Sequence, residues 1–168
     1  AEAPPRWPNG RARVHGGYTM RGRPVDVVET SRGCISDCSF CSIIEMGGRN
    51  FHNFPTARVL SDIADARRNG ARTIFVVDDN ITLDIRRFES LCQSIIDAGL
   101  NDLEYVVQAM TSPLAEHGAT LAPLMRRAGF RYVFLGIENI LEQDLAFLKA
   151  AAKNRLRDHG RVVGNATV

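Results

Sequence analysis

Strand-like and helix-like segments alternate four times along this chain, and that alternation constrains its fold more than any other feature. Apolar runs typical of strands cover residues 25–30, 73–77, 103–109 and 131–135. Apolar residues at helical spacing cover residues 56–70, 84–99, 120–129 and a segment from Leu141 onward. Such alternation is typical of a parallel sheet whose strands are joined by covering helices.

Right-handed crossovers between successive strands would curl such a sheet into an α/β barrel. We therefore expect a partial parallel (β/α) barrel of about four βα units over residues 25–168. Residues 1–24 are rich in Pro, Gly and Arg, which predicts an irregular lead-in or linker. Four units would leave an exposed edge at the last strand, so we expect the chain to be the amino-terminal part of a longer barrel.

The composition is that of an ordinary globular protein and names no partner. Apolar residues make up 45% of the chain and charged residues 24%, and the net charge of +2 is too small to indicate a nucleic-acid partner. No apolar stretch approaches the length of a membrane span, and the start of the chain lacks the apolar core of a secretory signal. We therefore predict a cytoplasmic protein, in which clustered cysteines serve as metal ligands or catalytic groups.

Cys34, Cys38 and Cys41 lie within eight residues, in a C-x3-C-x2-C pattern with Phe40 directly before the last cysteine. Three thiolates can hold three irons of a [4Fe-4S] cluster, whose four irons normally take one ligand each. One iron would then be open to bind a small molecule, which indicates chemistry on that molecule in place of electron storage.

The alternative is a non-catalytic zinc-binding module that uses the same three cysteines. Such a site needs a fourth ligand, for which His15, His52 and Cys92 are the candidates. Zinc ribbons and fingers usually pair two short ligand motifs, and the sequence contains no second one. Cys92 lies in the apolar stripe of a predicted helix, which indicates a buried thiol.

Polar side chains also lie at the ends of the second, third and fourth predicted strands. Asp78, Asp79 and Asn80 follow the second strand, Gln108 lies near the end of the third, and Glu138 follows the fourth. In α/β barrels the active site lies at the carboxyl ends of the strands. Each of these residues alone has a turn or capping interpretation, but their equivalent positions together predict a binding site beside the cysteines.

The cysteine pattern, directly after the first strand of such a barrel, resembles the radical S-adenosylmethionine enzymes. The resemblance runs from residue 25 to the end of the chain. It implies that the open iron binds S-adenosylmethionine, which is reductively cleaved to methionine and a 5′-deoxyadenosyl radical that abstracts hydrogen from a substrate. It also implies a reductant such as flavodoxin or ferredoxin.

Carried over by position, the resemblance makes the three cysteines cluster ligands. It implies that Phe40 packs by the adenine of the cofactor, that Gln108 faces the cofactor or substrate, and that Glu138 binds the ribose. Where the family commonly has a Gly-Gly-Glu patch that contacts the cofactor's amino group, this chain has Asp78 and Asp79 followed by an asparagine. That departure resembles the subset that carries a cobalamin-binding domain, many of whose members methylate unactivated carbons or rearrange rings. Cobalamin would be held by a domain outside this chain, and the sequence does not reveal the substrate.

Overall fold

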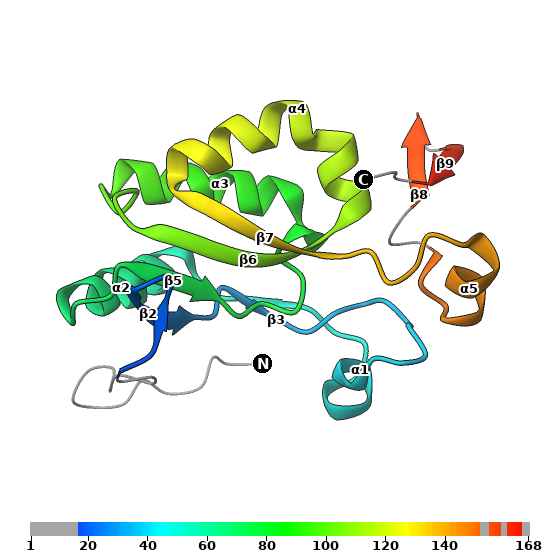
Figure 1. The fold of residues 1–168 in the computed structure, drawn as a ribbon, viewed down its shortest axis with the longest axis horizontal. Helices are drawn as coiled ribbons and strands as arrows, with labels where there is room; N and C mark the ends of the chain where they lie inside the picture. The colour runs from blue at the N-terminus through cyan, green and yellow to red at the C-terminus, as the bar shows by residue number, and fades with distance from the viewer. Residues whose placement is uncertain (1–16, 152–154, 159–160, 166–168) are drawn as a thin grey trace.

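The computed structural model describes residues 17–151, 155–158 and 161–165, so most of the predicted lead-in lies outside the described residues. Five of the described strands form one sheet in the order β1-β2-β5-β6-β7. The strands are β1 (Thr19–Met20), β2 (Arg23–Val28), β5 (Thr73–Val76), β6 (Glu104–Met110) and β7 (Phe130–Gly136). All neighbours from β2 to β7 are parallel, and β1 is antiparallel to β2. The sheet curls into a half-barrel, which confirms the predicted partial parallel barrel (Figure 1).

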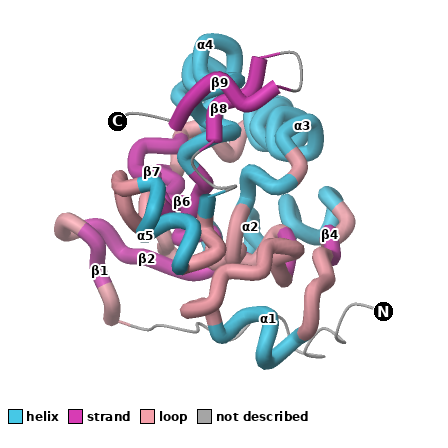
Figure 2. Tube along the Cα trace, turned by 90° about the vertical axis from the view of Figure 1, so that its right-hand side faces the viewer, coloured by secondary structure: helices cyan, strands magenta, loops and turns pink. Residues whose placement is uncertain are grey.

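Three helices join the parallel strands and cover the outer face of the sheet, namely α2 (Thr56–Arg68), α3 (Ile85–Asp97) and α4 (Thr111–Ala128). Two short helices, α1 (Ser42–Gly47) and α5 (Glu142–Phe147), both lie toward the end of the molecule where the parallel strands finish (Figure 1), which faces the viewer in Figure 2. The remaining elements are the two-stranded pairs β3 (Ser31–Arg32) with β4 (His52–Asn53) and β8 (Arg155–Asp158) with β9 (Arg161–Asn165), and a 3₁₀ helix, η1 (Ile81–Leu83).

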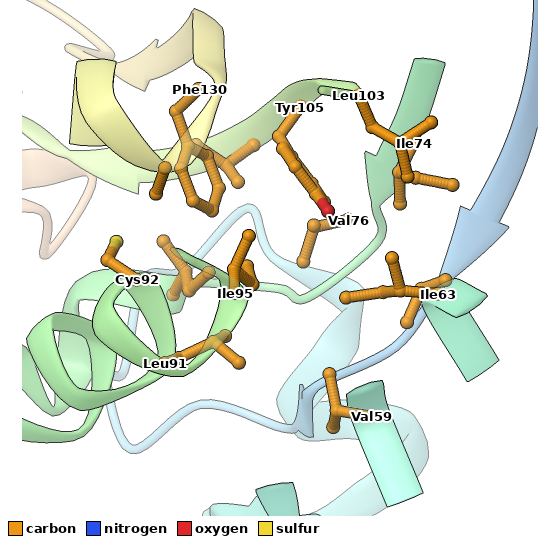
Figure 3. Close-up of a cluster of buried hydrophobic side chains, with 14 of the residues drawn as sticks. Val59, Ile63, Ile74, Val76, Leu91, Cys92, Ile95, Leu103, Tyr105 and Phe130 are labelled. Carbon is orange, nitrogen blue, oxygen red and sulfur yellow. The ribbon is translucent and has the colours of Figure 1, made fainter. Parts of the chain in front are cut away.

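The core lies between the sheet and the helices α2, α3 and α4 (Figure 3). Residues 105–107 of β6 are fully buried on both faces, as expected for an interior strand of a parallel sheet. Phe130 packs edge-on against Phe88 of α3, with ring centroids 5.2 Å apart, and its ring also contacts Tyr105. This packing fixes β6, β7 and α3 relative to one another at the amino ends of the two strands.

The boundaries of α3 agree with those predicted from the sequence, whereas the start of α4 does not. Asp84 caps α3 by accepting a hydrogen bond from the Arg87 amide at 3.0 Å, as predicted. The third helix was expected to begin at Thr120, and that expectation is wrong because α4 begins at Thr111. Pro123 therefore lies inside the helix, where it removes one helical hydrogen bond. Burial of the helix face that contains Leu121 offsets that cost.

The edge strand β7 exposes apolar side chains. Among the described strands it pairs only with β6, and Val133, Phe134 and Leu135 are exposed. This is the open edge expected for the last strand of a partial barrel. No described helix is long and apolar enough to cross a membrane, and the cytoplasmic location stays a prediction.

Candidate cofactor site

One cavity at the carboxyl ends of the strands brings together residues from the cysteine loop and from three parallel strands. Its volume is about 420 Å³, in the range of pockets that bind small molecules. The described residues that line it are Cys34, Ser36, Cys38, Cys41, Ile43, Ile44, Asp79, Asn80, Gln108, Ala109, Met110, Phe134, Leu135 and Gly136. The predicted convergence of the cysteines with the ends of the second, third and fourth parallel strands is therefore present.

The three thiols share this cavity but are not arranged as a finished metal site. Among the described residues, no group of three His, Cys, Asp or Glu side chains lies close enough to hold a metal ion. Metal binding to thiolates is generally coupled to local folding, so we expect the loop from Gly33 to Cys41 to tighten around a bound metal. The lining contains three cysteines and, within the described part of the chain, no histidine and no fourth cysteine. Three thiols fit a cluster with one open iron, whereas a four-ligand zinc site would need the carboxylate of Asp79, which already accepts a hydrogen bond from the Gly33 amide.

The cysteine loop begins at a glycine that no other residue can replace without strain. Gly33 has a φ of +91°, and a Cβ there would lie 2.4 Å from the backbone oxygen of Asn50. Its amide donates a hydrogen bond to Asp79 Oδ2 at 2.8 Å. Asp79, at the end of β5, thus orients the residue that precedes Cys34 while it also lines the cavity.

Asp78 is directed toward the loop start and does not line the cavity. It is buried, and it accepts hydrogen bonds from the Thr30 amide at 2.6 Å, the Thr30 hydroxyl at 2.5 Å and the Ser31 hydroxyl at 2.6 Å. Burial raises the pKa of the Asp78 carboxyl, and the hydrogen bonds from Ser31 and Thr30 oppose that shift. Asp78 therefore fastens the end of the first parallel strand, and with it the cysteine loop, to the second.

Arg87 of α3 completes this connection, and no signal in the sequence pointed to it. Its guanidinium donates hydrogen bonds to the Thr30 carbonyl oxygen and, at 3.3 Å, to the Thr30 hydroxyl. Burial lowers the pKa of Arg87, whereas the charges of Asp78 and Asp84 raise it. The buried carboxylate of Asp78 thus has a cation nearby that the protein itself supplies.

The other predicted site residues differ in how close they lie to the cavity. Gln108 lines it, at the end of β6. Phe40 is 48% exposed and does not line it, and neither does Glu138, which is exposed beyond the end of β7. Glu138 occupies the centre of a tight turn with φ +61°, in which the Asn139 amide bonds the Ile137 carbonyl at 2.7 Å. The roles of Phe40 and Glu138 stay predictions.

The segment after β7 folds back onto the cysteine loop. The Ala150 amide bonds the Leu145 carbonyl at 2.8 Å, and Lys149 has a φ of +53°, as in a Schellman turn at a helix end. This turn buries Leu145 and Ala150 against Cys38, which is only 3% exposed. A backbone hydrogen bond of 3.0 Å from the Ser39 amide to the Leu148 carbonyl adds to the contact.

The candidate fourth ligands for zinc lie elsewhere. Cys92 is fully buried in the core cluster between α3 and the sheet, and burial raises the pKa of its thiol to about 12. His52 is exposed in β4 and does not line the cavity, and His15 lies outside the described residues. The buried thiol predicted at Cys92 is confirmed.

Comparisons with known proteins identify relatives for most of the chain, although no protein-family model matches it. Over 117 residues it is 30% identical to the hopanoid C-3 methylase of Methylococcus capsulatus, a match covering 70% of the chain and 22% of the methylase. Over 132 residues it is 24% identical to the anaerobic magnesium-protoporphyrin IX monomethyl ester cyclase of Synechocystis, covering 79% of the chain and 26% of the cyclase.

Solved structures of TsrM, a radical S-adenosylmethionine methyltransferase of Kitasatospora setae, have the same fold. The TM-score is 0.69 at 23% identity, and the match covers 84% of the chain and 26% of TsrM. One TsrM structure contains tryptophan substrate and a S-adenosylmethionine analogue, and another contains cobalamin and a [4Fe-4S] cluster. The chain spans about a quarter of the length of these proteins. These relatives are enzymes, and they confirm the resemblance that the cysteine pattern indicated.

Proposed function

We propose that this chain, which is related to the radical S-adenosylmethionine enzymes, forms the part of such an enzyme that binds a [4Fe-4S] cluster and S-adenosylmethionine. The observation that carries the proposal is the single cavity lined by Cys34, Cys38 and Cys41 together with the ends of three parallel strands. When bound, such a cluster supplies the electron that cleaves S-adenosylmethionine to methionine and a 5′-deoxyadenosyl radical, which abstracts hydrogen from a substrate.

Different residues of the chain would bind the cluster and S-adenosylmethionine. The three cysteines bind three irons, and Asp79 and Gln108 face the nucleoside ligand from the ends of β5 and β6. An acidic residue beside the open iron suits the ammonium group of S-adenosylmethionine, because opposite charges at short distance stabilise each other. The apolar residues of α5 and its turn exclude water from the side of Cys38.

The reaction of the whole protein lies beyond what this chain carries. Methyl transfer is the activity named for the hopanoid methylase and for TsrM, and ring closure is that named for the cyclase. We propose that the complete protein is a cobalamin-dependent methyltransferase or a related radical enzyme. Cobalamin would bind to a domain outside this chain, and a flavodoxin- or ferredoxin-type reductant would supply electrons.

Anaerobic reconstitution of the chain with iron and sulfide tests the proposal directly. We expect a reduced [4Fe-4S] signal in electron paramagnetic resonance that changes shape when S-adenosylmethionine is added. Cys38→Ala should prevent cluster binding, whereas the matched variant Cys92→Ala should retain it, since Cys92 lies in the core. A chain that takes up zinc and forms no [4Fe-4S] signal would be the zinc-binding module, and the proposal would fail.

Glu138 requires a separate test because its side chain does not line the cavity. If it binds the ribose, Glu138→Ala should weaken S-adenosylmethionine binding by about 1–3 kcal/mol. Glu138→Gly should weaken binding equally while relieving the unfavourable positive φ of this residue. If instead Glu138 only shapes the turn, Glu138→Gly will stabilise the chain and leave the affinity unchanged.

A further inference from the structure

The segment after β7 covers one of the three cysteines with apolar side chains. Leu145 and Ala150 are each 1% exposed, and with Cys38, which is 3% exposed, they form a small buried cluster. Leu148 and Ala151 pack against the same cluster, and we call these four residues the apolar cover. None of the four lines the cavity, whereas Cys38 does. Cys38 therefore lies between the cavity on one side and the apolar cover on the other.

Two backbone amides close to Cys38 are already used by carbonyl oxygens. The Ser39 amide donates to the Leu148 carbonyl oxygen at 3.0 Å, and the Cys41 amide donates to the Cys38 carbonyl oxygen at 3.2 Å. Neither amide is free to donate to a sulfur atom. Because Leu148 belongs to the apolar cover, the cover both excludes water from Cys38 and occupies a neighbouring backbone donor.

The charged side chains on either side of this contact are exposed. Lys149, beside Ala150 in the turn, is exposed. Asp37, beside Cys38 in the loop, forms an ion pair with Arg49 at 2.8 Å, and both side chains are more than half exposed. Water and salt screen such exposed charges. We therefore attribute the environment of the Cys38 thiol mainly to the apolar cover.

An apolar environment affects how easily an iron–sulfur cluster accepts an electron. A [4Fe-4S] core of charge 2+ bound to three thiolates has a net charge of −1, and one added electron makes it −2. Water and hydrogen-bond donors stabilise the more highly charged reduced state, so their removal disfavours reduction. The reduction potentials of these clusters accordingly depend on hydrogen bonds to the sulfurs and on solvent exposure.

We infer that the apolar cover tunes the redox potential of the site: Leu145, Leu148 and Ala150 lower the reduction potential of the cluster by keeping water and hydrogen-bond donors away from the Cys38 thiolate. This inference rests on the proposed function of the cavity. The step concerned is the uptake of one electron from the flavodoxin- or ferredoxin-type reductant, which takes the core from 2+ to 1+. A cluster of lower potential then passes that electron to the sulfonium of S-adenosylmethionine more readily. The covering side chains are positioning residues, because they act on the cluster through Cys38.

Two substitutions make the apolar cover polar without changing a cysteine. Ala150→Ser adds one hydroxyl donor to the buried cluster with little change in volume, and Leu145→Asn places an amide of similar size in the same cluster. Leu145→Met is the conservative variant, since it keeps an apolar side chain of similar volume. Ala146→Ser is the matched control, because it makes the same change as Ala150→Ser at an exposed position of α5.

The experiment measures the midpoint potential of the reconstituted chain by a redox titration followed by electron paramagnetic resonance, without S-adenosylmethionine. One hydrogen bond gained near the thiolate should make the cluster of Ala150→Ser and Leu145→Asn roughly three- to tenfold easier to reduce, a rise of about 30–60 mV. Ala146→Ser and Leu145→Met should keep the potential of the parent chain. In D2O, spin-echo spectra of reduced Ala150→Ser should show an additional exchangeable deuteron near the cluster. Iron content and thermal unfolding are measured on every sample.

The outcomes separate this inference from the function on which it rests. If the parent chain forms the cluster and the folded, iron-loaded Ala150→Ser variant has the same potential, the inference is overturned while the proposed function stands. An equal rise in Ala146→Ser would overturn it as well. If the parent chain forms no [4Fe-4S] cluster, the proposed function fails and the inference fails with it. A rise confined to Ala150→Ser and Leu145→Asn supports the inference, and Ala150→Ser alone decides if Leu145→Asn does not fold.

Discussion

Replacing Asp78 with alanine should detach the cysteine loop from the sheet. The carboxylate accepts three hydrogen bonds from Thr30 and Ser31 at 2.5–2.6 Å, and it lies close to the cationic Arg87. Asp78→Ala would leave the buried Thr30 amide without its acceptor and Arg87 without its nearest buried anion. Both consequences act on the residues that lead directly into Gly33 and Cys34.

The expected cost follows from these contacts. Hydrogen bonds to a charged group contribute more than neutral ones, but burial of the carboxylate offsets part of the gain, as its raised pKa indicates. Removing one partner of a buried charged network typically costs about 3–5 kcal/mol. With a urea m-value of about 2 kcal/mol/M, the unfolding midpoint should fall by roughly 2 M.

Urea unfolding of the chain, followed by circular dichroism, measures this loss. Asp84→Ala is the matched control, because Asp84 also lies near the charge of Arg87 but bonds the Arg87 amide as a helix cap in place of Thr30 and Ser31, and its loss should cost about 1 kcal/mol. Hydrogen exchange of residues 30–41 should accelerate in Asp78→Ala and stay unchanged in Asp84→Ala. If the two variants lose equal stability and exchange equally, Asp78 does not fasten the loop and our reasoning is wrong.

Three further predictions concern the cysteines and their surroundings. Gly33→Ala should destabilise the chain by about 2–4 kcal/mol in urea unfolding, since it combines a positive φ with backbone overlap. In the folded, metal-free chain at pH 8, Cys92 should resist alkylation, as mass spectrometry would show, because burial raises the pKa of its thiol to about 12. Leu145→Ala should cost about 2–5 kcal/mol and speed alkylation of Cys38, whereas Phe147→Ala, at a position 83% exposed, should do neither.

The sequence predicted the architecture well because the barrel strands are apolar runs, and such runs can be recognised without knowing the contacts between distant residues. Strands β5, β6 and β7 begin and end within one or two residues of the predicted ranges. The start of α4 could not be predicted, because Gly118 and Pro123 resemble helix boundaries and only packing against α3 and β7 overrides them. The pair β3–β4 and helix α1 are too short to show a period.

The sequence identified the strand-end residues as a group, but it could not assign their directions. Asp78, Asp79 and Asn80 are consecutive and lie beyond the end of β5, where the alternation of a strand no longer assigns directions to side chains. Only the pairing of β2 with β5 shows that Asp78 meets Thr30 while the next two residues meet the cavity. Arg87 was beyond prediction, because its partner is 57 residues distant in the sequence.

The contact between the Schellman turn and the cysteine loop also means that Cys38 becomes buried only late in synthesis of the chain. Cys38 leaves the ribosome long before Leu145 and Ala150, which bury it in the folded chain. For the time needed to translate that interval, the Cys38 thiol of the nascent chain lacks this cover. Once the turn has docked, access to Cys38 requires local unfolding of residues 141–151. The same contact that covers Cys38 in the folded chain therefore leaves its thiol most accessible during synthesis.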